Sequence, residues 1–163
     1  MTILSIDSGI EKTGYAIFHK GKSNTGDPRL VTSGLIKTEK KLSIAKRLQI
    51  IFNELEQIIK KHKPKLVIVE QLFFFHNQKT AIQVSQSQGI ILLLSAQYNI
   101  EVQFLTPLQI KQIITGYGQS DKKAVQKMLK LILNLTIPSS RDDEADAIAC
   151  GLAYCYLNKK LVE

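Results

Sequence analysis

Residues 66–69 are the feature that most restricts the fold of this chain, because they form a continuous apolar run that ends in the acidic residue Glu70. Pro64 separates this run from a preceding segment with helical periodicity. A short strand that is apolar at every position must be covered on both faces, which is typical of a parallel strand lying between helices. The sequence therefore predicts an α/β domain built around this strand.

Other segments supply the rest of such a domain. Strands are expected at residues 3–7, 13–18, about 30–37 and about 101–105, with a turn at Ser8-Gly9 joining the first two. Helices are expected within residues 42–62, at about 77–98, after the cap Thr106, from the cap Ser120 to 133, and over 142–157. This order predicts a five-stranded mixed sheet with helices on both faces. It forms a single domain, residues 1–158, followed by a short tail, residues 159–163.

The charge of the chain narrows the choice of partner. Its 163 residues suffice for one sizeable core, and its formal net charge is +8. Such a basic domain favours a polyanionic partner, because each neutralised phosphate releases counterions. Dispersed basic residues, short apolar runs and no charged leader predict a cytoplasmic protein with no membrane role. Cys150 and Cys155 have neither zinc-ligand nor disulfide spacing, so free thiols are expected.

Acidic residues stand where a buried core would exclude them. Asp7 ends the first strand, Glu70 ends the fully apolar one, and Asp143 and Asp146 are three residues apart on one face of the last helix. Each has an ordinary interpretation, as a turn former, a solvated strand end or an acidic first helical turn. Together, beside a basic composition, they favour a site for hard divalent cations such as Mg²⁺ or Mn²⁺.

Five motifs in a fixed order carry a resemblance to a known family. They are LSIDSGIEKTGYAIF at residues 4–18, VIVEQLFF at 67–74, QSQG at 86–89, TPLQIKQIITGYGQSDKKAVQ at 106–126 and DDEADAIACGLAYC at 142–155. Over nearly its whole length the chain resembles the RuvC Holliday junction resolvases of bacteria and their phages. These belong to the retroviral-integrase and ribonuclease H-like superfamily.

The resemblance implies an activity and a site. It implies a ribonuclease H-like fold and a homodimer that hydrolyses two opposing strands of a four-way DNA junction with a metal-activated water. The implied cofactor is Mg²⁺, with Mn²⁺ as a substitute and two ions per site. In a cellular member a branch-migration helicase is the implied partner. The residues matched to metal-binding catalytic acids are Asp7, Glu70, Asp143 and Asp146.

The same resemblance implies DNA-binding residues. Phe73 matches an aromatic that stacks on a base near the opened junction, and Phe74 and Phe75 extend that aromatic run, although sealing a core or dimer seam would explain them equally. Lys111 and Lys122 match basic residues near the phosphate that is cut.

Two departures from the family pattern are visible. Ser8 stands where most bacterial members have proline, which predicts a looser turn with an unaffected carboxylate at Asp7. Glu144 adds an acid between the two helical aspartates. The abundance of lysine, isoleucine and asparagine fits an AT-rich genome, bacterial or phage, and a phage enzyme would be less selective for four-way junctions.

Three alternatives stay open at this point. A related ribonuclease H-like nuclease acting on RNA would share the acids. A phosphotransferase of the actin and sugar-kinase type would share the Asp7-Ser8-Gly9 motif, although the chain is half the size of two such lobes. A non-catalytic junction-binding module would keep the fold. Cleavage of junction DNA with and without magnesium separates these alternatives.

Overall fold

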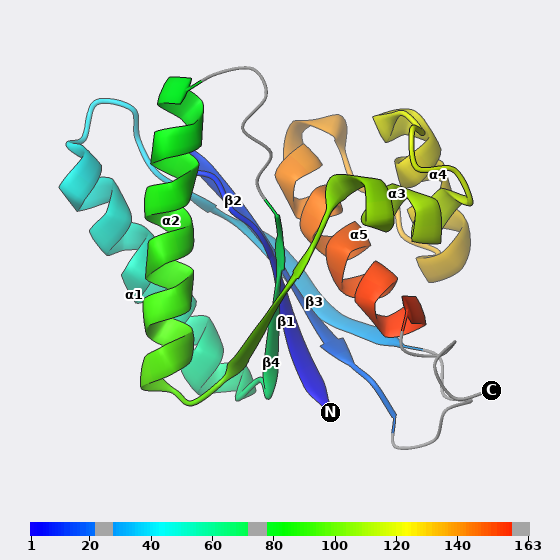
Figure 1. Cartoon of the computed structure of the whole chain (residues 1–163), viewed down its shortest axis with the longest axis horizontal. Coiled ribbons are helices and arrows are strands. Elements are labelled where there is room, and N and C mark those ends of the chain that lie inside the picture. Colours follow the sequence, from blue (N-terminus) through cyan, green and yellow to red (C-terminus); the bar gives the residue numbers. More distant parts are fainter. Residues whose placement is uncertain (22–27, 72–77, 158–163) are drawn as a thin grey trace.

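A computed structural model describes residues 1–21, 28–71 and 78–157 of the chain (Figure 1). The strands are β1 (Thr2–Asp7), β2 (Lys12–His19), β3 (Arg29–Lys37), β4 (Leu66–Glu70) and β5 (Glu101–Leu105). The helices are α1 (Ile44–His62), α2 (Gln78–Gln97), α3 (Pro107–Thr115), α4 (Lys122–Leu133) and α5 (Asp142–Leu157), and the 3₁₀ turn η1 (Ser139–Arg141) precedes α5.

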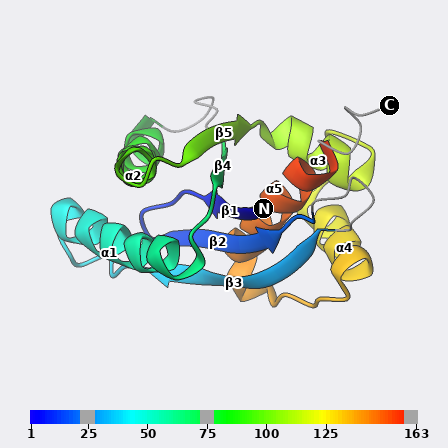
Figure 2. The ribbon, with the colours of Figure 1, turned by 90° about the horizontal axis from the view of Figure 1, so that it is seen from below.

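The five strands form one mixed sheet in the order β3-β2-β1-β4-β5. Strand β2 is antiparallel to both β1 and β3, whereas β4 is parallel to both β1 and β5. Helices α1 and α2 cover one face, and α3, α4 and α5 cover the other (Figure 2). The predicted fold class is therefore confirmed, including the parallel strand β4 buried from both sides.

Alternating side chains divide the core between these two faces. On the side of α1 and α2, Leu4 and Val67 pack with aliphatic residues such as Leu55. On the other side, Ile3 and Ile68 pack against α3, α4 and α5. The two-residue period of a strand therefore determines which face each side chain meets.

The helix ends follow local hydrogen bonds. Thr106 caps α3 as predicted, in a capping box with Gln109. The predicted cap Ser120 is wrong, because α4 begins one residue later and the Asp121 side chain accepts the hydrogen bond of the Ala124 N–H. The Ser120 hydroxyl instead lies 2.7 Å from the hydroxyl of Thr115.

Helix α5 packs unusually close to the sheet because small residues line the contact. A Cβ atom on Gly14 of β2 would lie 1.8 Å from the Asp143 carbonyl oxygen, and one on Gly151 would lie 2.5 Å from Ser5 Oγ. The Ser5 hydroxyl also donates to the Ala147 carbonyl oxygen at 2.8 Å. Close contacts of this kind fix the position of α5 relative to β1 and β2.

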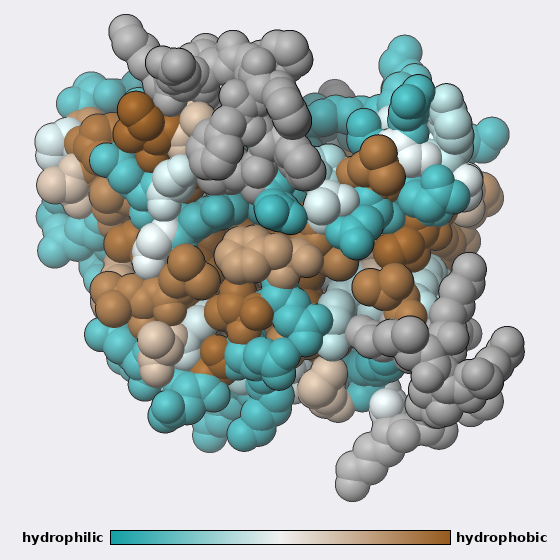
Figure 3. All heavy atoms as spheres, viewed as in Figure 1, coloured by the Kyte–Doolittle hydropathy of each residue, from teal (hydrophilic) through white to brown (hydrophobic). Residues whose placement is uncertain are grey.

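Part of the surface is apolar. Large exposed side chains lie on the outer side of α2 and on the edge strand β5, and hydrophobic residues gather over this region in Figure 3. In the part of the chain that the structure describes, no helix is long and apolar enough to cross a membrane.

Candidate active site

The ends of β1 and β4 bring the first two predicted acids together. Ile6 pairs with Val69 in the parallel register, so the next step along both strands sets Asp7 beside Glu70. Alternation places Asp7 on the same face as Ser5, which hydrogen-bonds α5. Glu70 shares its face with Ile68, which packs in the same core as α5. Both carboxylates therefore point toward that helix.

The first turns of α5 supply the other two acids. The Asp143 backbone lies against Gly14, the residue of β2 that pairs with Asp7. One turn later, Asp146 lines a hollow together with Glu70. Asp143 lines a second hollow, between the β1–β2 turn and α2. The four predicted acids thus surround the ends of β1 and β4.

Burial and repulsion between carboxylates raise the pKa values of Asp7, Glu70 and Asp146. Burial, and then the charges of Glu70, Asp146 and Asp143, raise the pKa of Asp7 well above its usual range. Burial and the charge of Asp146 raise the pKa of Glu70 to about 7, while two nearby lysines act in the opposite direction. Because the charge of each acid reaches others, the group is one electrostatic cluster that a cation would stabilise.

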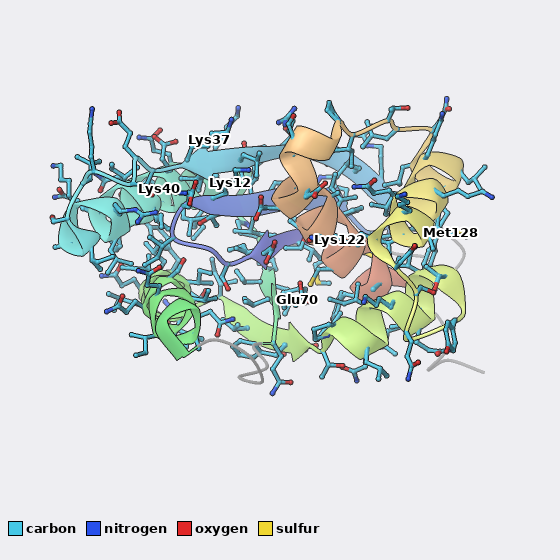
Figure 4. The ribbon with its side chains drawn as sticks, turned by 90° about the horizontal axis from the view of Figure 1, so that it is seen from above. Lys12, Lys37, Lys40, Glu70, Lys122 and Met128 are labelled. Carbon is cyan, nitrogen blue, oxygen red and sulfur yellow. The ribbon has the colours of Figure 1, made fainter. Side chains whose placement is uncertain are left out.

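Those lysines are the two predicted from the resemblance. Lys111 on α3 and Lys122 on α4 line the same hollow as Glu70 and Asp146. The Lys122 ammonium donates to Asp146 Oδ2 at 3.1 Å. Burial raises the pKa of Asp146, and Lys122 lowers it. Figure 4 shows Glu70 and Lys122 near each other in the middle of the view. Positive and negative groups therefore face one hollow.

The extra acid of α5 has a different environment. Glu144 is 4% exposed, and its Oε1 accepts a hydrogen bond from Ser33 of β3 at 2.6 Å. Its other oxygen forms an ion pair with Arg141. Glu144 therefore fastens the start of α5 to β3 and does not join the acidic cluster.

Sequence reasoning missed the contact made by Gln88. From α2 its side-chain amide donates to Ser8 Oγ at 3.1 Å and to the Glu70 carbonyl oxygen at 3.0 Å. It therefore bridges the residue after Asp7 and the residue that ends β4. The QSQG motif drew attention to this part of α2, but no local pattern links residues 80 positions apart in the chain.

The predicted aromatic residues Phe73 and Phe74, and their neighbour Phe75, lie outside the described residues. Their proposed contact with DNA bases stays a prediction.

The donor set fits a hard divalent cation. Asp7, Glu70, Asp143 and Asp146 offer only carboxylate oxygens, which suit magnesium or manganese. Among the residues described, no three Asp, Glu, His or Cys side chains already enclose a common point in the manner of a closed metal site. The backbone thus brings the acids to one place, and the Lys122 ammonium forms an ion pair with Asp146.

Comparisons with known proteins agree on one family. A family model described as crossover junction endodeoxyribonuclease RuvC matches residues 3–155. The crossover junction endodeoxyribonuclease RuvC of Thermosipho melanesiensis is 43% identical over 155 residues, which cover 95% of this chain and 96% of that protein. The protein of the same name from Fusobacterium nucleatum is 42% identical over 94% of this chain and 80% of its own length. The structure of Thermus thermophilus RuvC in complex with Holliday junction substrate aligns with a TM-score of 0.86 at 26% identity. The alignment covers 98% of this chain and 95% of that one.

Proposed function

This chain belongs to the family of crossover junction endodeoxyribonucleases called RuvC, and from that premise we propose that it resolves four-way DNA junctions at its carboxylate cluster. The observation that carries the proposal is one hollow lined by Glu70, Asp146, Lys111 and Lys122, next to Asp7. Acids for a metal and lysines for a phosphate lie together there, which is what phosphodiester hydrolysis requires.

The proposed substrate is branched DNA, above all the four-way junction. A relative 26% identical over 98% of this chain is known in complex with Holliday junction substrate. The net charge of +8 suits a polyanion of this size. Family membership weighs against the related RNA-processing nucleases and the sugar-kinase type of enzyme that share single motifs.

Asp7, Glu70, Asp143 and Asp146 would hold the metal. We expect Mg²⁺, replaceable by Mn²⁺, and two ions, since four neighbouring carboxylates repel one another strongly. When bound, such ions supply an activated water and neutralise charge at the phosphate that is attacked. The chain itself fixes the acids through the paired strands β1 and β4 and the close contact of α5 with β2.

Lys111 and Lys122 have a separate role in this proposal. They would bind the phosphate group that is cut and offset negative charge as it develops. Lys122 already compensates Asp146, so removal of this lysine would also disturb the acids.

We further propose that the enzyme acts as a homodimer through the outer side of α2. Ile82 and Leu93 there are 61% and 51% exposed, and Gly89, between them on the same helical face, has open space around it. A two-fold pair of α2 helices would bury this patch and provide two sites for symmetric nicks. A branch-migration helicase is the further partner that family membership suggests.

The dimer has a direct test by sedimentation. Leu93→Lys should convert the protein to monomers and abolish paired nicking. Leu131→Lys places the same charge at another exposed leucine, on α4, and should leave the dimer intact. An unchanged dimer in Leu93→Lys would refute the α2 interface.

The function is tested by cleavage of four-way, three-way and flap DNAs with and without magnesium. Asp7→Asn should abolish nicking while leaving junction binding largely intact, because phosphate contacts supply most of the affinity. Glu54→Gln, which removes an exposed acid on α1, should nick like the parent chain. Magnesium-dependent nicking by Asp7→Asn would overturn the proposed site, and a parent chain that binds junctions without cutting them would indicate a binding module.

A further inference from the structure

Two lysines lie directly opposite each other on neighbouring antiparallel strands. Lys12 begins β2, Lys37 ends β3, and the two residues are register partners. Partners in an antiparallel pair project from the same face of the sheet, with their Cβ atoms about 5 Å apart. Like charges in this position repel each other and lower the stability of the sheet. An arrangement that is unfavourable for the folded chain alone calls for a compensating anion.

Among the residues that the structure describes, no carboxylate at ion-pair distance supplies that anion. The neighbouring Lys40 forms an ion pair with Glu11 at 3.1 Å, and Lys41 forms one with Glu39 at 2.7 Å. Within the described ranges, neither Lys12 nor Lys37 forms an ion pair with any carboxylate. Glu11 and Glu39, the acids nearest in sequence, are therefore matched to other lysines.

The opposed lysines lie beside the carboxylate cluster. Lys12 is two residues from Gly14, the register partner of Asp7, and thus about 7 Å away along the strand on the same face of the sheet. Lys12 also lines the hollow to which Asp143 contributes. In Figure 4, Lys12 and Lys37 lie to the left of Glu70 and Lys122 lies to its right.

We infer that Lys12 and Lys37 form a second phosphate-binding site, which holds the backbone of the DNA strand on the β2–β3 side of the carboxylates. This inference rests on the proposed function. A lysine ammonium is a compact charge suited to phosphate oxygens, and a phosphate between the two lysines replaces their repulsion with attraction. With Lys111 and Lys122 on the opposite side, the strand is held on both sides of the bond that is cut.

The test measures junction binding in the absence of divalent metal as a function of NaCl concentration. The double variant Lys12→Gln/Lys37→Gln should bind more weakly at low salt. Its plot of log K against log salt should be shallower by about two units, about one for each lost phosphate contact. The double variant Lys12→Arg/Lys37→Arg retains both charges and should keep the parent slope.

A matched control separates position from net charge. Lys40→Gln/Lys41→Gln removes the same two charges from the same end of the molecule, but from lysines already paired with acids. Its slope should change by less than half as much. Equal changes in the two glutamine pairs, or an unchanged slope in Lys12→Gln/Lys37→Gln, would overturn the inference.

Thermal unfolding without DNA provides a second readout. Removal of opposed like charges should leave the melting temperature of Lys12→Gln/Lys37→Gln equal to that of the parent chain or slightly above it. A clear decrease would assign the lysines to the fold and refute the inference. Because binding is measured without metal, it is independent of the Asp7→Asn cleavage test, so the two proposals fail separately.

Discussion

The two faces of the sheet are built in different ways. Between the sheet and helices α1 and α2, branched aliphatic side chains such as Leu55 and Val67 fill the space. Between the sheet and α5, glycines allow close approach: Gly14 lies against the backbone of Asp143, and Gly151 lies against the side chains of Ser5 and Phe18. The acidic cluster lies on this second face, around Asp7.

The α1–α2 face contributes mainly to the stability of the fold, whereas the α5 face determines the positions of the acids. A layer of aliphatic side chains can adjust when one is shortened, at a cost in free energy but with little movement of the strands. A backbone-to-backbone contact cannot adjust without moving the helix, and α5 carries two of the four acids. The α5 face should therefore tolerate little change before catalysis fails, whereas the α1–α2 face should lose stability first.

Each side of the molecule has a lysine–carboxylate ion pair. Removal of the lysine from each pair should give the largest difference in cleavage rate between the two sides. Lys122→Gln removes the partner of Asp146 and should lower the single-turnover cleavage rate by at least about 100-fold, since charge near a reacting phosphate contributes on that scale. Lys60→Gln removes the partner of Glu56 on α1 and should leave the rate within about twofold, because exposed ion pairs contribute little. Comparable rates in the two variants would remove the distinction between the faces.

The next largest expected effect comes from substitutions in the packing on the two faces of the sheet. Gly14→Ala places a Cβ atom against the Asp143 carbonyl group, so the start of α5 must shift, and a displacement near 1 Å can lower a rate by about 100-fold. Leu55→Ala should lower the free energy of unfolding by about 2–5 kcal/mol and leave the rate of the folded protein unchanged. Urea unfolding and single-turnover cleavage measure the two quantities. A Gly14→Ala enzyme with the parent rate would show that the contact is adjustable.

The elements that carry this contrast were largely predictable from sequence. Residues 66–69 are apolar at every position, and only a strand buried on both sides explains them. The acids were recognisable because Asp7 and Glu70 end apolar strands, and the spacing of Asp143 and Asp146 puts them on one helical face. Their convergence followed once β1 and β4 were taken as neighbours.

Contacts between distant segments were not predictable. The opposition of Lys12 and Lys37 depends on the register of β2 with β3, which shifts between Ile17 and Phe18 and has no marker in the sequence. Lys111 and Lys122 came from the family resemblance, because single lysines on helices carry no local signal. The cap at Asp121 was misassigned to its neighbour since both residue types cap helices well.

Gln88 connects α2 to the residues next to the acids through its bonds to Ser8 and the Glu70 carbonyl oxygen. Its removal therefore tests whether a change on the α2 side alters the metal site. Gln88→Leu removes the bonds to Ser8 and to the Glu70 carbonyl group and should weaken Mg²⁺ binding by about tenfold, as loss of a residue that orients metal ligands does. Calorimetric titration with Mg²⁺ measures this without cleavage. Gln97→Leu, at the exposed end of α2, is the matched control.

A second substitution in the Gln88→Leu variant shows which of the two lost hydrogen bonds weakens Mg²⁺ binding. Ser8→Pro fixes the turn after Asp7 through the proline ring and needs no hydrogen bond from α2. In the Gln88→Leu background it should restore part of the lost Mg²⁺ affinity. Absence of rescue would leave the bond to the Glu70 carbonyl group as the important one.

The smallest expected effect is a pH dependence confined to the acidic face. The pKa of Glu70 is about 7 in the folded metal-free protein, above its ordinary value of 4.5, because burial and Asp146 disfavour the charged form. Between pH 4.5 and 7 the folded state therefore keeps a proton on Glu70 that the unfolded chain has already released. Its stabilising contribution is fully present below pH 4.5 and is lost as the pH rises through 7.

Urea unfolding of metal-free protein across this window should show a decrease in stability of order 1 kcal/mol from Glu70, since the group keeps some contact with solvent. Glu70→Gln should remove that part of the decrease, and Glu54→Gln on α1 should not. Mg²⁺ should oppose the trend, because the metal binds the ionised carboxylates and binds them more tightly as the pH rises. An equal decrease in Glu70→Gln and the parent chain would place the titrating group at another residue and contradict this assignment.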